Sequence, residues 1–88
     1  MYLSELIVGA GFAESRKDAK RKIEQRGVRI YLDGVKYTML KDVEIHFPIQ
    51  NFILNVGKIN FIKISVEYEV EESEENLKML YEYGYKEI

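Results

Sequence analysis

The dipeptide Asp33-Gly34 restricts the fold of this chain more than any other feature of its sequence. Asp-Gly favours positive φ angles at two successive residues, which a two-residue hairpin turn requires. Apolar residues alternate with polar or amphipathic ones over residues 28–32, and Val35 and Tyr37 begin a similar segment after the turn. This pattern predicts two antiparallel strands joined by a tight turn.

A second pair of strands is predicted further along the chain. Residues 52–56 form a compact apolar run of strand-forming residues, and Gly57-Lys58 marks a tight turn. Apolar side chains then alternate strictly with polar ones over residues 62–70, as in a long half-buried strand. Residues 38–51 between the two hairpins are less regular, and Pro48 favours a loop or a sheet edge there.

A basic helix is predicted before the first hairpin. Ser15 is a suitable N-cap because its hydroxyl can accept a backbone hydrogen bond, and Asp18 three residues later completes a weak capping box. The helix is expected to run to about Arg26 and to stop at Gly27. Its apolar stripe is narrow, so it buries one side and exposes a mostly cationic face.

Two further segments have helical periodicity. The first covers about residues 3–10, with Gly11 where a left-handed cap would fall. Near the C-terminus, Ser73 can cap a helix that carries an apolar stripe and stops at Gly84. The expected fold is α+β: two short helices packed on a small, mostly antiparallel sheet, with an added C-terminal strand extension and helix.

The charge of the chain is divided between segments. The net charge is −2, but residues 16–29 hold seven basic residues and two acids, and residues 67–88 hold eight acids and two lysines. At 88 residues the chain has the size of one domain. We therefore expect residues 1–66 to form the basic domain and residues 67–88 to be an acidic extension packed on it, turned away from any anionic ligand.

The basic helix is a candidate binding surface for phosphate. Arg16 and Arg21 can bind a phosphate bidentately, whereas Lys17 and Lys20 act as mobile point charges. The free N–H groups at the opening of a helix also attract anions. Charge alone leaves this interpretation about even with a solvated helix face, and it does not separate RNA from DNA or from an acidic protein.

Several other kinds of chemistry find little support in the sequence. The chain has no cysteine and a single histidine, His46, so a zinc site or a cysteine nucleophile is not expected. The acids at 67–75 lack the spacing of a calcium loop. No apolar run approaches the roughly 20 residues of a membrane span. We expect a cytoplasmic, non-catalytic protein with no cofactor and no metal.

One motif imitates a dinucleotide-binding loop. Gly9-Ala10-Gly11 follows an apolar pair, and Asp33 lies about where a ribose-binding acid would stand. The third glycine would fall at Glu14, whose carboxylate would repel a pyrophosphate. The helix that follows is also strongly basic instead of apolar, which disfavours this interpretation.

The order of these elements resembles a known RNA-binding family, the domain named after ribosomal small-subunit protein S-four. The residues that carry the resemblance are Leu3 and Leu6 in a first helix, Gly11-Phe12-Ala13 as the link, Ser15-Arg16-Lys17 opening a second helix, Ala19 and Ile23 inside it, Gly27-Val28-Arg29-Ile30, and the turn Asp33-Gly34. Residues 53–64 resemble the closing hairpin of the C-terminal domain of bacterial-type tyrosyl-tRNA synthetases.

This resemblance implies a tRNA-binding appendage that partners the catalytic domain of the same enzyme and does no catalysis of its own. The RNA-binding residues that it implies are those at the helix opening, namely Ser15, Arg16, Lys17, Lys20 and Arg21, together with Lys58 near the hairpin. Two alternatives remain: the same fold bound to ribosomal or another structured RNA, and a structural or protein-interaction module.

Overall fold

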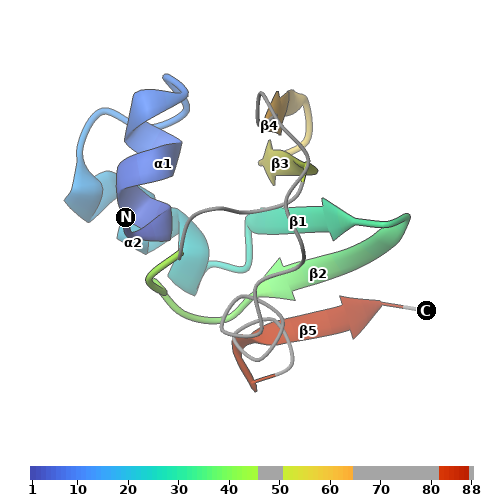
Figure 1. Cartoon of the computed structure of the whole chain (residues 1–88). Coiled ribbons are helices and arrows are strands. Elements are labelled where there is room, and N and C mark those ends of the chain that lie inside the picture. The colour runs from blue at the N-terminus through green and yellow to red at the C-terminus, as the bar shows by residue number, and fades with distance from the viewer. Residues whose placement is uncertain (46–50, 65–81, 88) are drawn as a thin grey trace.

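A five-stranded antiparallel sheet with two short helices gives this protein an α+β fold (Figure 1). The computed structural model describes residues 1–45, 51–64 and 82–87. The sheet order is β4-β3-β1-β2-β5, so β4 and β5 form its edges. The strands are β1 (Val28–Leu32), β2 (Val35–Met39), β3 (Phe52–Val56), β4 (Asn60–Ile64) and β5 (Gly84–Glu87). The expected fold class is therefore confirmed.

The first hairpin forms where the sequence predicts it. β1 and β2 pair antiparallel with Leu32 opposite Val35, so the turn contains only Asp33 and Gly34. Both turn residues have positive φ, +51° and +77° respectively. This is the backbone conformation that a two-residue turn needs in order to match the twist of its strands.

The second hairpin joins β3 to β4 through a turn in which Gly57 has a φ of +75°. β3 also pairs antiparallel with β1, with Leu54 opposite Ile30, and this pairing joins the two hairpins into one sheet. The long strand predicted over residues 62–70 is described as far as Ile64, and the rest lies outside the described residues.

Helix α1 (Leu3–Gly9) ends in a backbone motif centred on Gly11, whose φ is +82°. The N–H of Gly11 donates to the carbonyl of Val8, and the N–H of Phe12 donates to the carbonyl of Ile7. These two bonds satisfy carbonyls that the helix end would otherwise leave without partners. The glycines at 9 and 11 therefore end a helix and do not follow a strand, which excludes the dinucleotide-loop interpretation.

Helix α2 (Arg16–Glu24) begins at the predicted cap but ends earlier than expected. Arg26, and not Gly27, takes the left-handed conformation, with a φ of +62°. The N–H of Gly27 reaches back to the carbonyl of Lys22 at 2.9 Å, and a Cβ on Gly27 would lie 3.3 Å from that same oxygen. A side chain at position 27 would therefore be crowded against that carbonyl, whereas the positive φ falls on an arginine.

The core lies between the two helices and one face of the sheet. From the helices it takes Leu3, Ile7, Ala19 and Ile23, each at most 1 % exposed. Residues 28, 30 and 32 of β1 and 52, 54 and 56 of β3 are buried against them, as the period of a strand requires, and Asn55 on the other face of β3 is buried as well. The sheet and loop contribute Val28, Ile30, Leu32, Tyr37, Met39, Val43, Ile45, Phe52, Leu54 and Val56.

Two pairings were not predicted from the sequence. The segment after β2 returns to the N-terminus, where the N–H of Leu3 donates to the carbonyl of Val43 at 2.8 Å. At the other end of the chain, β5 pairs with β2 with Gly84 opposite Met39, beyond the point where a helix was expected to stop. The remainder of that expected helix, together with His46 and Pro48, lies outside the described residues.

Candidate nucleic-acid interface

The start of α2 is fixed by Ser15. Its extended backbone places the hydroxyl to accept a hydrogen bond from the N–H of Asp18 at 3.1 Å. The Asp18 carboxylate in turn accepts from the N–H of Glu14 at 3.2 Å, one residue earlier than in a standard capping box. The first bond within the helix runs from the N–H of Ala19 to the carbonyl of Ser15. The N–H groups of Arg16 and Lys17 precede the intrahelical bonds.

Arg16 points toward α1 and makes a network of internal contacts. Its Nε donates to the hydroxyl of Ser4 at 3.1 Å, and its guanidinium lies 3.7 Å from a carboxylate oxygen of Asp42 and 3.9 Å from one of Glu5. The guanidinium also lies 5.1 Å from the centre of the Tyr2 ring. Although its side chain is 47 % exposed, Arg16 is already paired within the fold.

Ser4 shows why this network matters for the fold. It is completely buried, and both its N–H and its hydroxyl donate to the carboxylate of Asp42, at 2.9 and 2.8 Å. A buried polar group that loses its partner costs free energy, so the network stabilises the contact between α1, α2 and the loop after β2. The structure thus gives Arg16 a role in positioning the start of α2.

A second set of charges is paired within α2 itself. The Asp18 carboxylate accepts from the guanidinium of Arg21 and from the ammonium group of Lys22, the latter at 3.0 Å. The Arg21 hydrogen bond, followed by those from Lys22 and the Glu14 N–H, holds the pKa of Asp18 well below its ordinary value of 3.8. Asp18 therefore stays ionised at neutral pH and offsets part of the positive charge around it.

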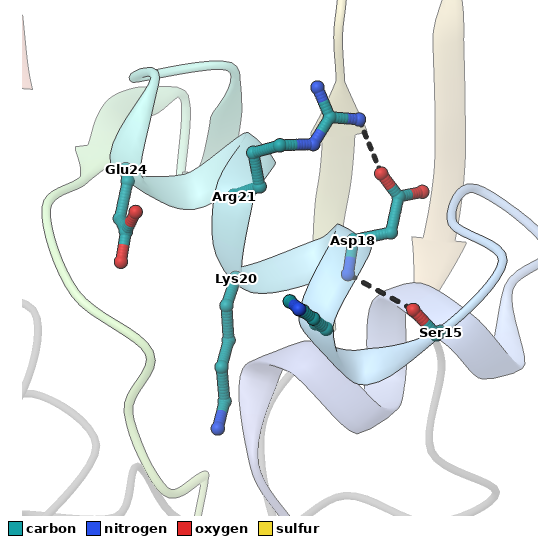
Figure 2. A pocket seen from close by; sticks show the side chains of 6 residues that line it. Ser15, Asp18, Lys20, Arg21 and Glu24 are labelled. Carbon is teal, nitrogen blue, oxygen red and sulfur yellow. Dashed lines mark hydrogen bonds and ion pairs between the residues drawn. The ribbon is translucent and has the colours of Figure 1, made fainter.

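Lys17 and Lys20 differ from these residues because both are exposed, and among the described residues neither has an acidic partner. They line a shallow, open hollow on α2 (Figure 2). In Figure 2, Arg21 leans toward Asp18, whereas Lys20 extends the other way. The hollow is lined by Ser15, Lys17, Asp18, Lys20, Arg21 and Glu24.

Lys58 lies in the exposed turn between β3 and β4. The N–H of Gly57 donates to the carbonyl of Gly27 at 2.8 Å, so this turn contacts the link between α2 and β1. The structure thus gathers four of the six predicted residues along one hollow, Ser15, Lys17, Lys20 and Arg21. It directs Arg16 toward α1 and places Lys58 beyond the C-terminal end of α2.

Sequence reasoning missed one acid that shapes this surface. Asp42 pairs with Arg16, but the two are far apart in sequence and no local pattern joins them. Glu24 follows Lys20 by four residues, so helical spacing puts both on one face of the helix, and the structure shows them lining the same hollow. Among the described residues, no group of three or more possible metal-binding side chains occurs, and no helix is long and apolar enough to cross a membrane.

Comparison with known proteins gives one informative match. Over 63 residues, or 70 % of its length, the chain is 36 % identical to the tyrosine–tRNA ligase of Xylella fastidiosa (strain Temecula1). That alignment spans 14 % of the ligase, so the chain is related to one region of a much longer protein. No family model matches the chain. No solved structure matches it either.

Proposed function

We propose that this chain is a non-catalytic RNA-binding domain of the S-four type that binds tRNA for a tyrosine–tRNA ligase. The observation that carries the proposal is the α2 hollow, where Lys17 and Lys20 stand exposed beside the capped start of the helix. The similarity of the chain to a region of a tyrosine–tRNA ligase supports the proposal that the bound RNA is tRNA(Tyr). It also supports the catalytic domain of such a ligase as the protein partner.

The mechanism is positioning by charge and shape. Lys17 and Lys20 supply mobile positive charges, and the N–H groups at the start of the helix attract anions as well. Each phosphate that the surface neutralises releases condensed counterions, which favours binding at low salt. The domain would hold the tRNA backbone while a separate active site performs the reaction.

The contributions of the other predicted residues follow from their partners. Ser15 caps the start of the helix. Arg21 is hydrogen-bonded to Asp18, which offsets part of its charge, and it can also approach a phosphate at the rim of the hollow. Arg16 acts through the fold, by fixing α2 against α1. Lys58 would make a separate phosphate contact beyond the end of α2.

We propose that residues 1–66 form an RNA-binding domain and that residues 67–88 form an acidic extension packed on it. The pairing of β5 with β2 supports one folded unit, because Gly84–Glu87 belongs to the same sheet as the N-terminal hairpin. The negative charge of the extension would disfavour RNA on its side of the molecule.

The test compares binding of this chain to tRNA(Tyr) and to a ribosomal RNA fragment of the same length, across a salt series. Tighter binding to tRNA(Tyr) is expected, with Lys17→Ala and Lys20→Ala each weakening it about three- to fivefold. Lys41→Ala is the matched control because Lys41 is an exposed lysine outside α2, stacked on Tyr83. Tighter binding to the ribosomal fragment would assign the domain to another RNA.

Unchanged affinity in both α2 variants would instead support a structural or protein-interaction module. Arg16→Ala would not test binding alone, because Arg16 also contributes to the fold.

A further inference from the structure

The face of the sheet that is turned away from the helices carries a group of exposed apolar side chains. The register sets residues of β1, β3 and β4 side by side in two cross-strand rows on this face. One row consists of Arg29, Asn55 and Phe61, and the other of Tyr31, Ile53 and Lys63. Phe61 is 55 % exposed and Ile53 is 41 % exposed, which is unusual for neighbouring large apolar residues on one surface.

The two aromatic rings on this face meet across β3. The ring centres of Tyr31 and Phe61 lie 6.3 Å apart with the planes inclined at 46°. This separation is within the range of favourable aromatic pairs. Because Phe61 remains largely exposed, its ring can still accept another flat group.

Cations surround this aromatic pair. Arg29 is held over the sheet by hydrogen bonds from its guanidinium to the side-chain oxygen of Asn55 at 3.2 Å and to the carbonyl of Gly57 at 3.5 Å. Lys63 lies in the row beside Phe61, exposed and without an acidic partner among the described residues.

We infer that this sheet face binds unpaired nucleotides of an RNA, with a base stacked on Phe61 and its phosphates near Lys63 and Arg29. Exposed aromatics with flanking cations suit a nucleotide, because the ring takes the flat base and the cations take the backbone. A face that bound an apolar protein surface would not need cations at these positions. The inference rests on the proposed RNA-binding function and adds a second surface to it.

The two surfaces are connected through the β3–β4 turn. Gly57 both accepts from Arg29 on the sheet face and donates to Gly27 at the end of α2. Lys58 in the same turn is exposed between the two regions. A paired RNA segment on α2 could therefore continue as an unpaired segment on the sheet.

The experiment measures binding of the full chain to two probes, a single-stranded oligoadenylate of about eight nucleotides and a fully paired RNA duplex. Phe61→Ala is expected to weaken oligoadenylate binding about tenfold and to leave duplex binding unchanged. Phe61→Tyr should retain the affinity because it keeps the ring. Phe61→Leu should lose it almost as completely as alanine, because it keeps apolar volume without a stacking surface. Ile59→Ala is the control, since Ile59 is 85 % exposed in the same hairpin but outside both rows.

The outcomes separate this inference from the proposed function. If Phe61→Ala leaves oligoadenylate binding unchanged while a Lys17→Ala/Lys20→Ala variant loses duplex binding, the sheet-face inference is wrong and the proposed function stands. If the wild-type chain binds neither probe, both are wrong. Self-association of the wild type that Phe61→Ala abolishes, measured by sedimentation, would make this face a protein interface and overturn the inference.

Discussion

Both sides of α2 carry basic side chains, but those on one side are paired with groups inside the fold and those on the other are exposed to solvent. On the side toward α1, Arg16 is held by Ser4 and Asp42. On the side toward solvent, Lys17 and Lys20 line an open hollow and have no acidic partner among the described residues. The comparison shows that a count of basic residues overstates the charge available to a ligand, because internal acids already neutralise part of it.

The largest effect is expected on the paired side. Asp42→Ala removes the acceptor of both Ser4 hydrogen bonds and a partner of Arg16, and should lower the free energy of unfolding by about 2 kcal/mol. Denaturant unfolding measures the change. Glu44→Ala is the matched control, because it removes an equal charge from an exposed residue of the same loop. Equal stability of the two variants would show that the contacts of Asp42 with Ser4 and Arg16 do not stabilise the fold.

The opposite pattern is expected on the solvent side. A Lys17→Ala/Lys20→Ala variant should keep its stability within about 0.5 kcal/mol. It should bind tRNA about tenfold more weakly at low salt, with the slope of log affinity against log salt reduced by roughly 1 to 2. Filter binding across a salt series measures both quantities. A Lys17→Arg/Lys20→Arg variant keeps the charge and should keep the affinity. A loss of stability comparable to that of Asp42→Ala would contradict the prediction that Lys17 and Lys20 serve binding and not the fold.

Asp18 affects both stability and RNA binding, because it pairs with basic residues of α2. Its replacement should therefore lower the stability of the fold and raise the affinity for RNA. Asp18→Asn frees the charges of Arg21 and Lys22, and we expect RNA affinity at neutral pH to rise a few-fold while stability falls. The native pKa of Asp18 is lowered, so its stabilising effect is complete above the unfolded value near 3.8 and is lost as the pH falls below it.

The stability difference between wild type and Asp18→Asn should therefore be largest at neutral pH. It should shrink between about pH 4 and about pH 2, which thermal unfolding at a series of pH values would reveal. A difference that grows on acidification would contradict the assigned charge pairing.

The smallest effect is expected at Glu24, the exposed acid of the hollow. Glu24→Gln should raise RNA affinity by up to about twofold, because one repulsive charge at the surface is removed under screening. Stability should not change, since the hydrogen bond from Arg26 goes to the Glu24 backbone carbonyl, which the substitution keeps. Glu44→Gln, with the charge removed away from α2, provides the comparison. A decrease in affinity on Glu24→Gln would argue that the ligand does not approach this hollow.

The sequence by itself determined the local elements of this protein. Asp33-Gly34 fixed the first turn because its conformation is a property of two neighbouring residues, and Ser15 fixed the start of α2 for the same reason. The alternation over residues 28–32 also gave the buried face of β1 correctly. The basic character of α2 was likewise a local property, so its position was predictable.

Only the tertiary structure decided which of those basic residues are available. Asp42 reaches Arg16 because the loop after β2 returns to the N-terminus, and β5 reaches β2 from the other end of the chain. The face shared by Tyr31 and Phe61 exists because β1 and β4 lie on either side of β3. These contacts depend on packing between residues that are distant along the chain, and local propensity carries no information about such partners.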